Sequence, residues 1–209
     1  MKVTDKITIT NEDNMAMMAR YPDNYFDLAI VDPPYGIDIN SSGTHFKEKY
    51  DVKDWDKNTP DDEYFKELKR VSKNQIVWGG NYFLDRLRNC KCFIIWDKKI
   101  AEDMSFAMCE MAWTSFKNGA KIYKTTAMQQ NRIHPTQKPV KLYEWLLKNY
   151  AKEGNKILDT HLGSGSIAIA CHNYKYELTA CELDKDYYNN AIKRIKQHTA
   201  QTTIFDLGA

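Results

Sequence analysis

Four acidic residues follow short runs of residues that are predicted to form β-strands. Asp13, Asp32, Asp159 and Glu182 come at or just after the runs ITIT, DLAIV, KILD and LTACE. Ligands of open α/β sheets bind outside the carboxyl ends of the strands, so we expect these carboxylates along one edge of a sheet. An acid after a strand is common by itself, because Asp also caps helices. Two of the four acids, however, adjoin unusual turns.

The first of these turns contains Gly163, Ser164 and Gly165. Its glycines let the backbone approach a ligand closely, just before a helix whose first N–H groups are free. The run GSGSIA also fits the G-x-G-x-x-A pattern of dinucleotide sites, with Glu182 about 20 residues further on to hold ribose hydroxyls. A carboxylate at Asp159, before the loop, would repel a pyrophosphate but suits an ammonium group. A nucleoside with a cationic amino-acid tail therefore fits better than a nicotinamide dinucleotide, which stays open as the alternative.

The second turn is the run Asp32, Pro33, Pro34 and Tyr35. Its simplest interpretation is a rigid end to a strand, because proline cannot donate to a β-ladder. The two prolines also leave backbone carbonyls without a local partner, so these carbonyls can serve as acceptors. Asp32 adds a further acceptor, and Tyr35 adds a flat ring for stacking. This set suits the exocyclic amine of a planar base.

The elements that position these turns alternate along the chain. The predicted strands are Ile7–Thr10, Asp27–Val31, Gln75–Trp78, Cys92–Trp96, Met111–Phe116, Lys156–Asp159 and Leu178–Glu182. The predicted helices are Met15–Tyr21, Asp61–Ser72, Gln137–Asn149, Ile167–Asn173 and Tyr187–His198. Strands separated by helices indicate an α/β fold with a largely parallel sheet that is covered on both faces.

The composition indicates one soluble domain. The chain has 209 residues, 43% of them hydrophobic, which excludes wholesale disorder. We expect a single domain over residues 1–198, with a long loop at 36–59, a further excursion at 117–133 and a tail at 199–209. Five cysteines without C-x-x-C spacing indicate neither a disulfide framework nor a metal site. The N-terminus lacks the apolar stretch of a signal peptide and no run reaches the ~20 apolar residues of a membrane span, so a cytoplasmic location is expected.

Three motifs together resemble one known family. The DPPY run at residues 32–35 resembles the catalytic motif of amino-group DNA methyltransferases, and Asp159–Ser166 resembles their glycine-rich loop for S-adenosylmethionine. His134–Pro139 reads HPTQKP and matches the segment that precedes this loop in the family. The order of the motifs is that of the circularly permuted β class. The resemblance covers roughly Ile7 to Ile195, which is nearly the whole chain.

The resemblance implies a fold and a cofactor. The fold is the class I methyltransferase fold, a Rossmann-like doubly wound sheet of seven mostly parallel strands with one antiparallel strand. The cofactor is S-adenosylmethionine, with Glu182 at its ribose, Asp159 near its amino group and Asp13 near its adenine. The implied positions near its carboxylate are those of Thr136 and Lys138. The loop residues Gly163, Ser164 and Gly165 complete the implied cofactor site.

One departure from the family pattern lies in the glycine-rich loop. The family commonly has Pro-Phe after the loop's acid, where this chain has Thr160 and His161. The phenylalanine that would line the cofactor pocket is therefore missing or replaced. We expect His161 to line the pocket and not to transfer protons.

The activity implied is direct methyl transfer from S-adenosylmethionine to the N6 amine of an adenine in DNA, after the base has left the duplex stack. Asp32 and the Pro33 carbonyl would accept the N–H groups of the amine, and Pro34 and Tyr35 would complete the site, with Tyr35 stacking on the base. Transfer to cytosine N4 is the main alternative. More remote alternatives are an NAD-dependent oxidoreductase and an inactive DNA-binding protein. A link to a restriction-modification system is also implied.

The charge distribution indicates where DNA would bind. The net charge is only +2, but no acidic residue lies between Glu110 and Glu144. The expected target-recognition segment, residues 117–133, is too short to bury a core of its own, and the loop at 36–59 is a second candidate. The expected DNA-binding residues are Lys47, Lys49, Lys53, Lys117, Lys121, Lys124, Gln129, Gln130, Asn131 and Arg132. Recognition could be relaxed, confined to a short site or assisted by a second subunit in a homodimer.

Overall fold

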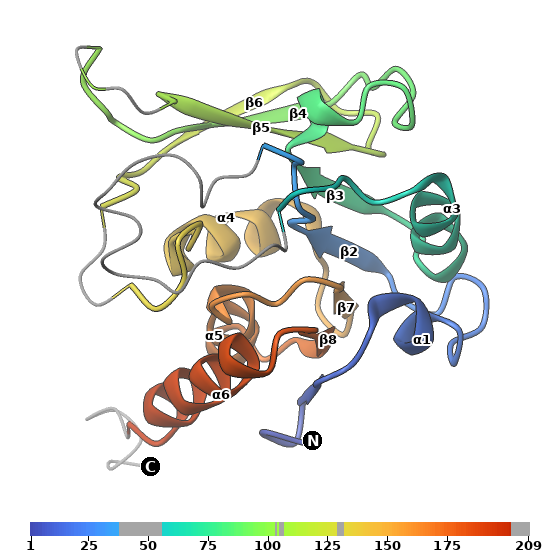
Figure 1. The fold of residues 1–209 in the computed structure, drawn as a ribbon, viewed down its shortest axis with the longest axis vertical. Helices are drawn as coiled ribbons and strands as arrows, with labels where there is room; N and C mark the ends of the chain where they lie inside the picture. Colours follow the sequence, from blue (N-terminus) through green and yellow to red (C-terminus); the bar gives the residue numbers. More distant parts are fainter. Residues whose placement is uncertain (38–55, 103, 105–106, 129–131, 202–209) are drawn as a thin grey trace.

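The computed structural model describes residues 1–37, 56–102, 104, 107–128 and 132–201. These residues contain one mixed sheet with the strand order β1-β8-β7-β2-β3-β5-β4-β6 (Figure 1). The strands are β1 Ile7–Thr10, β2 Leu28–Val31, β3 Gln75–Trp78, β4 Phe93–Asp97, β5 Cys109–Thr114, β6 Lys121–Lys124, β7 Lys156–Asp159 and β8 Glu177–Cys181. Strand β5 is antiparallel to its neighbours β3 and β4, and the other described pairs are parallel. The predicted fold class, with its one antiparallel strand, is confirmed.

The strand β6 is an eighth strand that the sequence did not predict. It extends the edge of the sheet beside β4 and takes four residues from the expected target-recognition segment, 117–133. Its sequence, KIYK, is only four residues long and has a lysine at each end, so the pattern of apolar residues fits a basic loop as well as a strand. The ring of Tyr123 stacks on Trp145 of the adjacent helix at a centroid distance of 4.9 Å, whereas Ile122 is 64% exposed. Packing of one face against a helix therefore fixes this strand.

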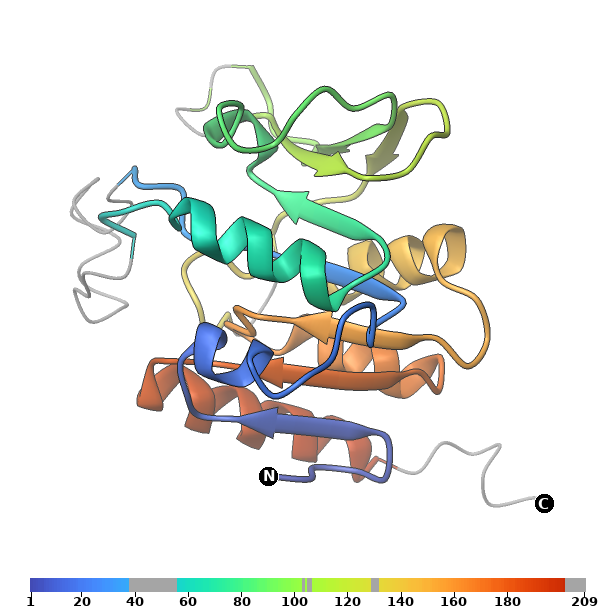
Figure 2. The same cartoon turned by 90° about the vertical axis from the view of Figure 1, so that its right-hand side faces the viewer.

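Helices cover both faces of the sheet, as predicted. The helices are α1 Asn14–Met18, α3 Asp62–Val71, α4 Val140–Tyr150, α5 Ser166–Asn173 and α6 Lys185–Thr199, with a 3-10 turn at Gly80–Tyr82. Helices α1 and α3 lie on one face, and α4, α5 and α6 lie on the other (Figure 2). Helix α4 begins three residues later than predicted, because Pro139 holds an extended conformation at its N-cap. The residues before it are thereby free to form part of the site.

The central strand β2 shows how the two hydrophobic layers arise. Leu28 and Ile30 belong to the core under α4, α5 and α6, while Ala29 and Val31 belong to the core under α1 and α3. All four side chains are buried, as expected for a parallel strand covered on both sides. Within the described residues, no helix is long and apolar enough to cross a membrane.

Several predicted features lie outside the described residues. They are Lys47, Lys49 and Lys53 of the long loop, and the run from Gln129 to Asn131. Most of the predicted C-terminal tail, residues 202–209, also lies there. The domain boundaries at 1–198 and 199–209 stay predictions.

Candidate active site

A cavity of about 1120 Å³ opens at the carboxyl ends of the strands. It is lined by residues that follow β1, β2, β7 and β8, together with residues of the HPTQKP segment. The predicted site residues in its wall are Asp13, Asp32, Pro34, Thr136, Lys138, His161, Gly163, Ser164 and Glu182. The other predicted catalytic and cofactor-binding residues, Pro33, Tyr35, Asp159 and Gly165, adjoin these lining residues in the same turns. The fold therefore brings both special turns to one cavity.

Glu182, after β8, fixes the glycine-rich loop through a direct hydrogen bond. Its Oε2 accepts the backbone N–H of Gly163 at 2.8 Å, and its Oε1 accepts that of Asp184 at 2.9 Å. Burial raises the pKa of Glu182, although these N–H groups oppose that rise. After the neighbouring strand β1, the carboxylate of Asp13 caps α1 by accepting the N–H groups of Met15 and Ala16. Both carboxylates thus shape the backbone that surrounds the cavity.

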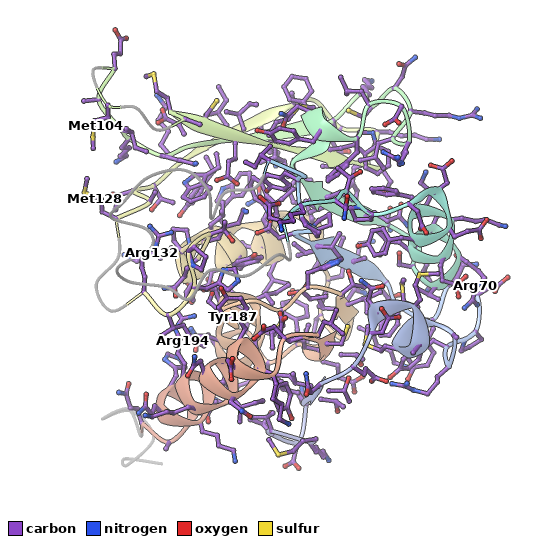
Figure 3. All side chains as sticks on the ribbon, viewed as in Figure 1. Arg70, Met104, Met128, Arg132, Tyr187 and Arg194 are labelled. Atoms are coloured by element: carbon purple, nitrogen blue, oxygen red, sulfur yellow. The ribbon has the colours of Figure 1, made fainter. Side chains whose placement is uncertain are left out.

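Gly165 serves the packing behind the loop. Its φ is +75°, in the left-handed region, and a Cβ there would lie 2.8 Å from Cδ1 of Ile195 on α6. From the same helix, Arg194 donates to the carbonyl of Ser164 at 2.8 Å and to Oγ of Ser166 at 3.0 Å (Figure 3). Helix α6 therefore holds the loop in place from below.

Asp159 lies beneath the loop and is only 3% exposed. Its Oδ1 accepts the N–H of His161 at 3.0 Å. Burial raises the pKa of Asp159 to about 8, despite that hydrogen bond and with a smaller contribution from the charge of Asp32. An ammonium group in contact with this carboxyl would favour its ionised form and so lower its pKa.

His161 takes part in a chain of hydrogen bonds along the cavity wall. Nδ2 of Asn14 donates to Nε2 of His161 at 3.0 Å, and Nδ1 of His161 lies 2.9 Å from Oγ1 of Thr160. Oγ1 of Thr160 also lies 2.7 Å from the hydroxyl of Tyr64 on α3. Burial lowers the pKa of His161 to about 4, so its imidazole is neutral. Thr160 and His161 thus form a polar wall where the resembling family commonly has Pro-Phe.

The carboxylate of Asp32 is held by two donors. The Tyr35 hydroxyl donates to its Oδ1 at 2.6 Å, and Lys138 Nζ donates to its Oδ2 at 2.6 Å. The buried carboxylate of Asp56 fixes the turn by accepting the N–H groups of Tyr35 and Gly36 at 2.7 and 3.2 Å. Burial raises the pKa of Asp32, and the charge of Lys138 opposes that rise. Asp56 therefore fixes the backbone of the turn, and the two donors orient the carboxylate of Asp32.

A second carboxylate shares the ammonium group of Lys138. Glu110 on β5 accepts from Lys138 Nζ at 2.9 Å through Oε2 and from Lys98 Nζ at 2.7 Å through Oε1. Although burial alone would raise the pKa of Glu110, these two ammonium groups lower it. Burial alone would likewise lower the pKa of Lys138, and the carboxylates of Asp32 and Glu110 raise it. The cluster therefore holds two negative and two positive charges.

The ring of Tyr35 is packed inside the protein. It stacks on Tyr82 with 4.9 Å between ring centroids and 14° between planes, and it lies directly against Gly79. Tyr82 is 42% exposed, so the stack reaches the surface. Tyr35 was predicted to stack on the target base, but in this structure its ring already stacks on Tyr82.

The sequence of the site region is similar to sequences of known DNA methylases. Residues 95–193 match the N6_N4_Mtase family model, which describes DNA methylases. The type II methyltransferase M.HpaI of Haemophilus parainfluenzae is 34% identical over 67 residues, which are 32% of this chain and 21% of that relative. The methylase match thus spans about a fifth of the length of M.HpaI.

Solved methylase structures share the whole fold. The M1.HpyAVI complex with SAM superposes with a TM-score of 0.62 at 19% identity, covering 90% of this chain and 99% of that one. The cytosine-N4-specific PvuII DNA methyltransferase superposes with a TM-score of 0.63 at 11% identity, covering 97% and 96%. These likenesses establish the class I methyltransferase fold.

Some residues of this site were not predicted from the sequence. Glu110, Lys98 and Tyr64 belong to no motif and reach the site only through the pairing of β4 with β5 and the packing of α3. Tyr143 of α4 lines the cavity, and burial together with the charges of Asp32, Asp159 and Glu110 raises its pKa. Helical periodicity would assign Tyr143 to the core, so only the structure identifies it. Among the described residues, no cluster of His, Cys, Asp or Glu could hold a metal ion.

The predicted DNA-binding residues lie at different places on the methylase fold. Lys124 is at the carboxyl end of β6, 3.6 Å from Asp97, whereas Lys121 at the amino end donates to Asn149 near the end of α4. Lys117 is exposed in the turn before β6. Arg132 donates to the carbonyl of Pro135 in the HPTQKP segment (Figure 3). Lys121 and the cavity therefore lie at opposite ends of the sheet.

Proposed function

We propose that this protein is a DNA methyltransferase that transfers the methyl group of S-adenosylmethionine to the N6 amine of adenine. One observation carries the proposal. Asp32 and Pro34 of the DPPY turn, Gly163 of the glycine-rich loop and Glu182 line the same cavity. The match of residues 95–193 to the family model of DNA methylases supports this assignment.

The donor set around the glycine-rich loop suits S-adenosylmethionine. Asp159 and Glu182 bring carboxylates to the loop, where they would repel a pyrophosphate but favour an ammonium group and ribose hydroxyls. Glu182 would hold the ribose and Asp159 the amino group, with Asp13 on the adenine side. Thr136, His161 and the loop backbone complete the wall. When bound, the cofactor supplies an electrophilic methyl group on its sulfonium centre.

Asp32 would act on the amine that receives the methyl group. This amine is a weak nucleophile because its lone pair is delocalised into the ring. Hydrogen bonds from its N–H groups to the Asp32 carboxylate and the Pro33 carbonyl would favour sp³ geometry at nitrogen. They would also stabilise the positive charge that would develop on the nitrogen as it accepts the methyl group, before the nitrogen loses a proton to solvent. Positioning of the two reactants supplies much of the remaining rate enhancement.

DNA is the proposed partner, and the base must leave the duplex to reach Asp32. The aspartate of DPPY favours adenine, because a serine often stands at that position in cytosine-N4 enzymes of the family that the motif resembles. Cytosine N4 is the second candidate, because the PvuII enzyme of the same fold is cytosine-N4-specific. A homodimer would be one way to extend recognition beyond the short segment 117–133, because the second subunit could contact further bases.

The test is methyl transfer to plasmid DNA from labelled S-adenosylmethionine, followed by mass spectrometry of the nucleosides. We expect N6-methyladenine; N4-methylcytosine would reassign the base, and the absence of both products would overturn the proposal. Thermal shifts with S-adenosylmethionine and with NAD separate the methyltransferase from the oxidoreductase alternative. A stable protein that binds DNA without methylating it would be the inactive DNA-binding alternative.

The variant Asp32→Ala tests the role of the DPPY turn. Loss of the acceptor should lower the transfer rate about 10²–10³-fold, the usual effect of removing a group that stabilises charge in a transition state. Cofactor affinity should change little, because Glu182 and Asp159 are untouched. Asp62→Ala is the matched control, because Asp62 is an 87% exposed carboxylate on α3. Transfer by Asp32→Ala near the wild-type rate would exclude this mechanism.

A further inference from the structure

The ion pair between Asp32 and Lys138 conflicts with the chemistry proposed for Asp32. Lys138 Nζ lies 2.6 Å from Oδ2 of Asp32, and the Tyr35 hydroxyl lies 2.6 Å from Oδ1. Methyl transfer places positive charge on the target nitrogen, so the carboxylate beside it must remain effectively negative. An ammonium group committed to Asp32 would cancel that charge and repel the nitrogen. Methyl transfer therefore requires a second acceptor that can bind this ammonium group in place of Asp32.

Glu110 offers a second acceptor to each donor on Asp32. Its Oε2 lies 2.9 Å from Lys138 Nζ and 3.4 Å from the Tyr35 hydroxyl. The Lys138 side chain is only 2% exposed, so water cannot balance its charge and the two carboxylates must do so. Lys138 and Tyr35 thus lie between Asp32 on one side and Glu110 on the other.

Lys98 keeps Glu110 in the position to do this. It follows β4, and its Nζ binds Oε1 of Glu110 at 2.7 Å, which leaves Oε2 directed at Lys138. The register of β4 and β5 pairs Trp96 with Glu110, so the backbone of two strands fixes the carboxylate. Glu110 lies outside the cavity wall and is not placed to touch a bound base or cofactor.

We propose that Glu110 is a positioning residue that shares the charge of Lys138, so that Asp32 retains the negative charge required for methyl transfer. This inference rests on the proposed function. In the reacting complex, Lys138 and Tyr35 shift toward Glu110, and an oxygen of Asp32 is released to accept the N–H of the target amine.

The test is the kinetics of Glu110→Gln with the full-length protein, S-adenosylmethionine and plasmid DNA. We expect kcat to fall about tenfold or more, while KM for the cofactor and for DNA stays within about twofold, because the lost charge acts on the chemical step. Glu67→Gln is the matched control: it also changes an ion-paired carboxylate to an amide, in its pair with Arg70, on α3 and outside the cavity wall. Its kcat should equal that of the wild type.

The pH profile of kcat separates positioning from a purely structural role. The negative charge of Glu110 raises the pKa of Asp32, so its removal should move the acid limb of the profile to lower pH while the plateau falls. Reduced stability alone would lower the rate without moving this limb. The groups that face Asp32 and remain in the variant are Lys138, Tyr35, Tyr64, Tyr143 and Asp159.

Each outcome decides the inference. A wild-type kcat and an unmoved acid limb in Glu110→Gln, with active wild-type protein, would overturn the inference alone. Absence of methyl transfer by the wild type would overturn the proposed function and the inference with it. If Glu110→Gln does not fold, Glu110→Asp serves in its place, because the shorter side chain withdraws the carboxylate from Lys138. It should lower kcat and shift the limb in the same direction to a smaller extent, and an unchanged profile would again overturn the inference.

Discussion

The carboxyl group of Asp159 should make the stability of the ligand-free protein depend on pH. Its pKa is about 8 in the folded protein, and an unfolded Asp has a pKa of about 3.9. The folded state therefore binds the proton more tightly, and this stabilisation is complete below pH ~4 and is lost as the pH rises through about 8.

The prediction is tested by comparing the wild type with Asp159→Asn, which cannot ionise. Without cofactor, the melting temperature of the wild type should decline relative to the variant between pH 5 and pH 9. A loss of ~1 kcal/mol lowers the melting temperature of a domain of this size by about 2–4 °C. Parallel curves for the two proteins across this range would contradict the assigned pKa.

Glu182 gives a second prediction for a single residue. Glu182→Ala removes the acceptor for the N–H of Gly163 and, by our proposal, the partner of the cofactor's ribose. Charge-assisted hydrogen bonds contribute ~1.5–3 kcal/mol, so the dissociation constant for S-adenosylmethionine should rise roughly 10- to 100-fold by calorimetry. Glu177→Ala, at the exposed start of the same strand, should bind with unchanged affinity. Equal affinities of the two variants would exclude the role of Glu182.

The sequence could place the acids of the site but not their partners. Asp13, Asp32, Asp159 and Glu182 each follow a strand, and parallel strands align their carboxyl ends, so their gathering at one edge was predictable. The contact of Lys138 with Asp32 was not, because a flexible lysine near several carboxylates can pair with any of them. The contact of Glu110 with Lys138 was not predictable either, because the position of Glu110 depends on the register of an antiparallel strand.

The elements were predictable where periodicity and proline boundaries were strong. Strand β2 ends before Pro33 and Pro34, and β7 leads into the glycine-rich loop, as expected. Strand β6 and the start of α4 were not predicted, because the first depends on the stacking of Tyr123 against Trp145 and the second on the extended backbone at Pro139. The local sequence predicts neither the side-chain stacking that fixes β6 nor the backbone conformation that delays the start of α4.

The junction between β3 and the DPPY turn offers a prediction at the scale of elements. Gly79 follows β3 with φ of +70°, and a Cβ there would lie 2.2 Å from the ring of Tyr35. This ring cannot yield easily, because it stacks on Tyr82 and is hydrogen-bonded to Asp32. Gly79→Ala should therefore cost the ~1–2 kcal/mol of a left-handed alanine and additionally displace Tyr35. Methyl transfer should fall with it.

Gly154→Ala is the matched control. Gly154 has φ of +79° but open space around its Cβ position, so the variant carries the backbone cost alone. Urea denaturation should show a larger loss of unfolding free energy for Gly79→Ala, and only that variant should lose transfer activity. Equal losses in the two variants would show that the Tyr35 ring moves aside freely.

At the scale of the whole molecule, the direction of the sheet decides where DNA can approach. The cavity lies at the carboxyl ends of the strands, so the duplex must lie along that edge to deliver a base to Asp32. The excess of basic residues in the second part of the chain spans both edges, and the two ends of β6 carry one lysine each. Lys124 lies at the carboxyl end, and Lys121 lies against α4 near Asn149.

These positions predict opposite results for two variants of one strand. Lys124 is 66% exposed at the edge that faces the proposed DNA, so Lys124→Ala should weaken binding to all sequences and reduce the slope of log affinity against log salt by ~1. Lys121→Ala should leave both quantities unchanged, because its ammonium group faces Asn149 and the rings of Trp145 and Tyr150. Fluorescence anisotropy with labelled duplex at several salt concentrations measures both. A reduced slope for Lys121→Ala, with none for Lys124→Ala, would place DNA at the opposite edge and contradict delivery of the base to Asp32.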